Sequence, residues 1–157
     1  MIEFRPLTEA DLPLLRTWLE RDHVKRWWRE PADEEIAQDR EGRYLIVLDG
    51  RPAGMIQTYL VADHPEWSAI VGTEPGLAGV DLLIGEEDLV GHGLGPRALE
   101  QFVREVVFAQ PETSACVATV EEGNRRSRRA FEKAGFRHAG DVGEDGLPHR
   151  LLRLDRR

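Results

Sequence analysis

The sequence predicts an α/β protein of the mixed α+β kind, in which helices lie on both faces of a mixed sheet. Three observations support this fold class: helix-like and strand-like segments alternate, an Asp-Gly turn joins two apolar strands, and a glycine loop separates a strand from a helix. With 157 residues, the chain is long enough to bury a substantial core. We therefore expect a single domain over residues 1–157.

The first 40 residues should form a short strand and two helices. The segment Thr8–Asp11 is a capping box, and Leu12, Leu15 and Leu19 follow it on one helical face. A proline and two acids within 31–34 predict the start of the second helix. We expect a strand at 2–6, a helix from about 9 to 21 and a helix from 31 to about 40.

A tight hairpin should follow these helices. Asp49 and Gly50 supply the positive φ angles that a two-residue turn needs, and strands at 44–48 and 52–60 flank the turn. The segment 62–76 contains two prolines and two glycines and is predicted to be irregular, with at most one helical turn. Loops of this length are often functional. Another strand is expected at 78–84.

Helices and strands alternate in the remaining part of the chain. Pro96 at the first helical position should begin a helix that reaches residue 108. The buried stripe of this helix should consist of Leu99, Phe102, Val103 and Val106. We expect a strand at 114–120, a helix at 125–134 that Gly135 ends, and two last strands at 136–139 and 149–154.

Composition and charge exclude several classes of protein. The 29 acidic and 21 basic residues give a net charge of −8, which argues against nucleic-acid binding and permits a cationic partner. The single cysteine, Cys116, cannot form an internal disulfide or a cysteine-rich zinc site, and it should be a packed thiol. The chain has neither a membrane-spanning stretch nor a signal-peptide core, so we expect a cytoplasmic protein. We also expect no metal site.

The charges are also unevenly distributed along the chain. No Lys or Arg lies between Arg51 and Arg97, whereas four arginines crowd the segment 125–129. The gap without basic residues contains Asp63, Glu66, Glu74, Asp81, Glu86, Glu87 and Asp88.

The loop Gly91–Pro96 has three glycines within five residues, between a predicted strand and a predicted helix. Such a loop can turn several backbone N–H groups toward one point, and the helix dipole adds positive potential, which together favour a diphosphate. The alternative is a glycine turn without a ligand. A dinucleotide-binding fold is excluded because several strands precede the loop, and a P-loop is excluded because no Gly-Lys-Ser or Gly-Lys-Thr follows.

The glycine loop and the segment 130–136 (Ala-Phe-Glu-Lys-Ala-Gly-Phe) resemble motifs of the GCN5-related N-acetyltransferases (GNAT). This resemblance implies a central, mostly antiparallel sheet. Within the superfamily, the chain is similar to the aminoglycoside 6′-N-acetyltransferases over about residues 3–140. The segments that carry this similarity are Leu7–Leu12, His23-Val24, Trp27-Trp28, Gln57–Tyr59, Gly79–Asp81 and Gly93–Gly95.

The resemblance implies acetyl-coenzyme A as donor, with its diphosphate on the loop amides and its pantetheine arm along the strand near Leu83. Asn124 would contact that arm, and charge-assisted contacts from the arginines at 125–129 would favour the phosphates. The implied cofactor-binding residues are Leu83, Gly91, His92, Gly93, Leu94, Gly95, Pro96, Asn124 and Arg129.

Asp81 interrupts the apolar strand at 78–84, ten residues before the glycine loop, and should project near the acyl end of the cofactor. The resemblance implies that it binds the reacting amine or takes its proton. The alternatives are an aspartate paired inside the sheet and proton transfer through water. Aromatic faces suit sugar rings, and carboxylates suit ammonium groups. The expected substrate-binding residues are Trp27, Trp28, Gln57, Tyr59, Glu66, Trp67, Glu74, Asp81 and Glu121, with Asp141, Glu144 and Asp145 as further acids.

Two positions depart from the family pattern. Phe131 stands where related enzymes carry a tyrosine that protonates the coenzyme A thiolate, and Val90 stands where many have Gln or Arg at the loop entrance. The leading expectation is acetylation of the 6′-amino group of aminoglycosides by a monomer or homodimer. The alternatives are acylation of a hydroxylysine siderophore precursor, a polyamine or a protein N-terminus, and an acyl-CoA-binding domain without catalytic activity.

Overall fold

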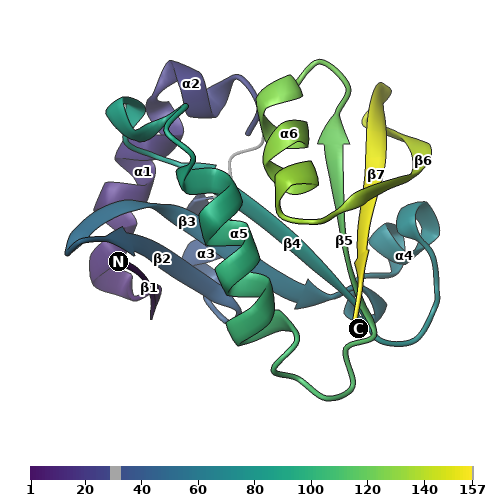
Figure 1. Cartoon of the computed structure of the whole chain (residues 1–157). Coiled ribbons are helices and arrows are strands. Elements are labelled where there is room, and N and C mark those ends of the chain that lie inside the picture. The colour runs from purple at the N-terminus through teal and green to yellow at the C-terminus, as the bar shows by residue number, and fades with distance from the viewer. Residues whose placement is uncertain (29–32, 157) are drawn as a thin grey trace. The chain divides into compact units, whose positions relative to one another are not determined.

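The computed structural model describes residues 1–28 and 33–156 and contains a seven-stranded mixed sheet of order β1-β2-β3-β4-β5-β7-β6 (Figure 1). The β1–β2, β2–β3, β5–β7 and β6–β7 pairs are antiparallel, whereas β4 and β5 are parallel. The predicted mixed, mostly antiparallel sheet with helices is therefore confirmed.

The chain forms two compact units. The first consists of Met1–Gln57 and Leu82–His92, and the second consists of Thr58–Asp81 and Gly93–Arg157. Strands β3 (Arg51–Leu60) and β4 (Leu77–Ile84) each contribute residues to both units. The prediction of one domain over residues 1–157 stays a prediction.

The first unit confirms the predicted strand, capped helix and hairpin. The carboxylate of Asp11 accepts hydrogen bonds from the backbone N–H and the hydroxyl of Thr8, at 2.9 and 3.0 Å, and the helix follows directly. Asp49 and Gly50 both have positive φ angles, as the hairpin requires. The elements are β1 (Ile2–Pro6), α1 (Leu12–Glu20), α2 (Asp22–Lys25), α3 (Asp33–Gln38), β2 (Arg43–Leu48) and the first part of β3.

Two details of these helices differ from the prediction. The buried face of α1 contains Leu12, Leu15 and Trp18, whereas Leu19 is only half-buried. The short helix α2 follows α1 and was not predicted. The predicted start of the next helix at Pro31 and Ala32 lies outside the described residues.

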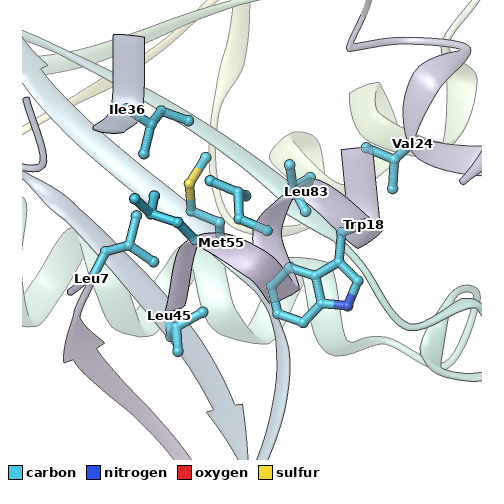
Figure 2. Close-up of a cluster of buried hydrophobic side chains, with 9 residues drawn as sticks. Leu7, Trp18, Val24, Ile36, Leu45, Met55 and Leu83 are labelled. Atoms are coloured by element: carbon cyan, nitrogen blue, oxygen red, sulfur yellow. The ribbon is translucent and has the colours of Figure 1, made fainter. Parts of the chain in front are cut away.

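The core of the first unit packs around Trp18, whose indole is fully buried (Figure 2). A Cβ atom on Gly85 would lie 2.1 Å from the Trp18 ring, so only glycine fits at this position. The labelled side chains of this cluster are Leu7, Trp18, Val24, Ile36, Leu45, Met55 and Leu83.

In the second unit, the segment predicted to be irregular contains a helix of seven residues, α4 (Pro65–Val71). Helix α5 (Leu94–Phe102) begins at Leu94, so Pro96 is its third residue and not its first. A π-helical turn at Val103–Val107 follows, in which the N–H of Phe108 donates to the carbonyl of Val103. Because this turn holds one extra residue, Val107 is buried where Val106 was expected.

The C-terminal part of the second unit contains β5 (Ala115–Glu121), α6 (Arg125–Lys133), β6 (Arg137–Glu144) and β7 (Leu147–Asp155). The last two strands are longer than predicted and form a hairpin, with positive φ angles at Asp145 and Gly146. The polar, largely exposed sequence of β6 hid its length, because an edge strand of this kind has little apolar alternation.

Candidate active site

The parallel pairing of β4 with β5 is short. Among the described residues, the register covers only Leu77, Ala78 and Gly79, which lie opposite Ala115, Cys116 and Val117. Strand β4 continues for five further residues, and Asp81 is the second of them. The candidate catalytic residue thus lies just beyond the point where the ladder to β5 ends. Backbone groups that leave a ladder are available to a ligand that lies along the strand.

Tyr59, on β3, lies over the backbone of Gly79 in the second unit. A Cβ atom on Gly79 would lie 2.3 Å from Cζ of the tyrosine ring. The Trp67 indole donates a hydrogen bond to the tyrosine hydroxyl, and the His64 imidazole meets the tyrosine ring edge-on at 5.2 Å. These aromatic residues come from β3 and the segment that was predicted to be irregular. The predicted substrate residues Tyr59 and Trp67 therefore do lie together.

Two carboxylates act on the hydroxyl of Tyr59. Burial is the main cause that raises the pKa of this phenol, and the negative charges of Asp81 and Glu144 raise it further. Glu144 accepts a hydrogen bond from the Thr119 hydroxyl at 2.9 Å and lies 3.6 Å from the His149 imidazole. The arrangement places two acids near one neutral, aromatic hydrogen-bonding group, which suits a cationic ligand.

Cys116 confirms the expectation of a packed thiol. The residue is fully buried in β5, and burial raises the pKa of its thiol, with a smaller contribution from the charge of Asp81. A neutral, buried thiol is a poor nucleophile.

The other predicted acids have different surroundings. Glu74 forms a two-fold ion pair with Arg153, at 2.6 and 3.0 Å, which lowers the pKa of the glutamate. Asp141 is exposed and lies 2.9 Å from the His138 imidazole. The remaining three are Glu66, exposed in the first turn of α4; Glu121, half-buried on β5; and Asp145, in the last hairpin turn. Glu74 is already occupied by a guanidinium group, so it is a weaker candidate for substrate binding than Glu144.

Three predicted substrate residues belong to the first unit. Trp27 and Trp28 follow α2, and Gln57 is the last residue of β3 in this unit. Trp28 is half-buried and packs against the hydrophobic core of the first unit. Trp27 is half-buried, and the Arg26 guanidinium lies 5.1 Å from the centre of its ring. The side-chain oxygen of Gln57 accepts a hydrogen bond from Nε of Arg43 at 2.9 Å.

The glycine loop has the backbone geometry that a phosphate cradle requires. Gly91 and Gly93 have φ angles of 82° and 81°, and a Cβ atom at either position would meet no atom within 4 Å. Gly93 is the N-cap of α5, so the N–H groups of Leu94 and Gly95 lie in the first turn of that helix. His92 is exposed, and Pro96 has no N–H group to donate. These residues fit an anionic diphosphate.

The remaining predicted cofactor residues are a helix cap, an exposed arginine and a buried leucine. The side chain of Asn124 caps α6 by accepting a hydrogen bond from the Ser127 N–H at 3.3 Å. Arg129 is exposed on α6, and Leu83 is buried in the core of the first unit. Phe131, which replaces the family's tyrosine, packs edge-on against Phe136 at 5.1 Å and is buried.

Sequence reasoning missed a charge network just before the glycine loop. Arg51 binds both Asp88 and Glu86, and Glu86 also accepts a hydrogen bond from the Trp18 indole at 2.6 Å. The run of acids at 86–88 was visible, but its basic partner is far away in the sequence. No local sequence pattern links Arg51 to these acids.

Residues 1–28 and 33–156 contain no group of three or more His, Cys, Asp or Glu side chains that could hold a metal ion. None of the helices in these ranges has the length and apolar character that a membrane crossing requires. A hollow in the first unit, lined by Leu12, Arg16, Arg40 and their neighbours, contains none of the predicted site residues.

Comparisons with known proteins identify the family of this chain. A family model described as an acetyltransferase (GNAT) domain matches residues 8–143. The chain is 30% identical over 154 residues to aminoglycoside N(6′)-acetyltransferase type 1 of Klebsiella pneumoniae, covering 90% of this chain and 76% of that protein.

Solved structures give the same result. Aminoglycoside acetyltransferase AAC(6′)-Ib in complex with coenzyme A and kanamycin has a TM-score of 0.88 and 29% identity, covering 99% of this chain and 95% of that one. Its complex with paromomycin and acetyl-CoA also has a TM-score of 0.88, with 30% identity over 99% of this chain and 93% of that one. The chain belongs to the GNAT family of acetyltransferases.

Proposed function

We propose that this chain transfers the acetyl group of acetyl-CoA to the 6′-amino group of aminoglycosides, by direct transfer within a ternary complex. The observation that carries the proposal is the packing of Tyr59, which accepts a hydrogen bond from Trp67, over Gly79, two residues before Asp81 on β4. Relatives named as aminoglycoside N(6′)-acetyltransferases over most of the chain support the same acceptor.

The acceptor side of this proposal follows from charge. An aminoglycoside carries several ammonium groups, and carboxylates beside flat aromatic rings provide both charge complementarity and stacking surfaces. Asp81, Glu144, Tyr59 and Trp67 supply these groups in the second unit. The net charge of −8 would also increase the encounter rate with a polycation.

The chemistry requires that the amine be neutral when it forms the new C–N bond. Acetyl-CoA supplies the acetyl group as a thioester, with a thiolate as the leaving group. Asp81 binds the ammonium form and accepts the proton that the amine loses, directly or through a water molecule. Tyr59 keeps its proton, because burial and the neighbouring carboxylates raise its pKa. It therefore acts as a hydrogen-bonding group that contacts the acceptor and not as a base. With Phe131 unable to donate, we assign the return of a proton to the thiolate to solvent.

The test is coenzyme A release from acetyl-CoA by the purified protein. Kanamycin, tobramycin, spermidine and a lysine-containing peptide serve as separate acceptors. We expect release with the aminoglycosides only, and product analysis should place the acetyl group on the 6′-nitrogen. Release with spermidine or the peptide in place of the aminoglycosides would contradict the proposed acceptor, and release with none would contradict the proposed activity.

A further inference from the structure

The segment that leads into the glycine loop is strongly acidic. Glu86, Glu87 and Asp88 precede Gly91, and Asp88 is three residues away from it. Three residues span at most about 11 Å, and the screening length at physiological salt is about 8 Å. Uncompensated carboxylates at this distance would therefore repel an anionic ligand held by the amides of the loop.

A single arginine from the start of β3 compensates two of these acids. The guanidinium of Arg51 donates to both carboxylate oxygens of Asp88 at 2.9 Å and to Glu86 at 3.2 Å. The other oxygen of Glu86 lies 3.2 Å from the Arg21 guanidinium. All of these residues belong to the first unit.

The compensated acids are close to the loop itself. Hydrogen bonds from Arg51 are the main cause that lowers the pKa of Asp88, and the charge of His92 contributes to the same shift. His92 lies between the two glycines with positive φ angles. Asp88 is thus three residues from the first of these glycines and four residues from His92.

We propose that Arg51 is a positioning residue for acetyl-CoA, which neutralises and holds Asp88 and Glu86 so that the glycine loop can accept a diphosphate. The proposal rests on the assignment of the loop as the diphosphate site. Arg51 contacts neither substrate and acts through the two carboxylates.

The test compares Arg51→Gln with the wild-type chain. The dissociation constant of coenzyme A, measured by titration calorimetry without any acceptor, should rise about three- to fivefold at low salt. The KM for acetyl-CoA should rise by the same factor, with kcat unchanged. The difference should disappear in about 1 M salt, where the screening length is about 3 Å. Arg137→Gln, which removes a comparable exposed partner of Asp155, is the matched control and should leave coenzyme A binding unchanged.

Two further measurements separate charge compensation from a general loss of structure. S-acetylpantetheine lacks the phosphates, so Arg51→Gln should leave its KM unchanged. The double variant Arg51→Gln/Asp88→Asn removes one positive and one negative charge and should recover most of the affinity for coenzyme A. Normal coenzyme A affinity in Arg51→Gln at low salt, an equal loss with S-acetylpantetheine, or no recovery in the double variant would overturn the proposal. A chain that shows the salt-dependent effect but acetylates no aminoglycoside would refute only the proposed acceptor.

Discussion

Asp81 and Asp88 come from the same stretch of chain, residues 52–96, which contains no Lys or Arg, yet their surroundings differ. In the first unit, Asp88 lies in the fork of the Arg51 guanidinium. In the second unit, burial raises the pKa of two neutral groups, Tyr59 and Cys116, and the charge of Asp81 raises it further. Acids of one type and one sequence region thus have different surroundings: Asp88 is paired with an arginine, whereas the charge of Asp81 acts on two neutral groups of the second unit.

The comparison teaches that the number of acids in a sequence says little about a site. The function of each carboxylate depends on whether a guanidinium group reaches it, and the arginines that do so come from distant segments. Arg51 pairs with Asp88, and Arg153 pairs with Glu74. Variants that change one of these acids or its surroundings at a time should therefore have different effects.

The largest effect is expected from Asp81→Asn. This change removes the group that binds the ammonium and accepts its proton, so kcat/KM for kanamycin should fall by at least about tenfold. Steady-state rates of coenzyme A release provide the measurement. Asp141→Asn, at an exposed acid beside His138, is the control and should retain activity. An unchanged rate in Asp81→Asn would remove Asp81 from the mechanism.

Alanine at two tightly packed glycines should separate activity from stability. Gly79→Ala places a Cβ atom 2.3 Å from the Tyr59 ring, and Gly85→Ala places one 2.1 Å from the Trp18 ring. Each overpacked side chain should cost about 1–3 kcal/mol of unfolding free energy. Urea denaturation measures this cost.

Only Gly79→Ala should also raise the KM for the acceptor, because Tyr59 must move. A Gly85→Ala variant whose aminoglycoside KM rises equally would contradict the role of Tyr59 in binding the acceptor.

A smaller effect is expected from Glu144→Gln. An ammonium group that meets this carboxylate would lose a charge-assisted hydrogen bond, so the KM for kanamycin should rise about tenfold. The matched variant is Glu74→Gln, because Arg153 already occupies that carboxylate, and its KM should stay within about twofold of wild type. An equal rise in the KM of both variants would show that the ion pair with Arg153 does not prevent Glu74 from binding the acceptor.

The smallest effect concerns the pH dependence of stability. The pKa values of Glu86 and Asp88 are lowered in the folded state from ordinary values of 4.5 and 3.8. Their stabilising contribution is therefore complete above these values and is lost as the pH falls through the lower, folded-state values.

Because Arg51 is the main cause of the shift at Asp88, Arg51→Gln should be less stable than wild type near neutral pH. The difference should shrink as the pH falls through the lowered folded-state pKa values and both acids become protonated. Urea unfolding at several pH values measures it. A difference that stays constant with pH would rule out this ion pair as its source.

Local patterns predicted a large part of the fold. The capping box at Thr8–Asp11, the Asp49-Gly50 hairpin and the helix that Gly135 ends are all confirmed, because each depends on backbone geometry within a few residues. Helix α4 was missed because prolines and glycines flank it closely. The π-helical turn was missed because residues 106 and 107 are both valines, so the apolar pattern fits the helix with or without the extra residue.

The site was predicted less completely than the fold. The aromatic residues Tyr59 and Trp67 and the acid Asp81 were identified, and the structure brings them together in the second unit. Glu144 was one acid among several, and only its position near Tyr59 distinguishes it from Glu74. Arg51 was not considered, because its partners lie 35 and 37 residues further along the chain.

The sequence by itself determined the order of the strands along the chain, the glycine loop and the types of side chain that can serve an anionic donor and a cationic acceptor. These depend on φ preferences, short spacings and side-chain chemistry, which are properties of neighbouring residues. Only the tertiary structure decided which acids are neutralised by arginine and which surround Tyr59. The physical reason is that the strength of a charge depends on the groups within a few ångströms of it, and folding brings those groups from distant parts of the chain.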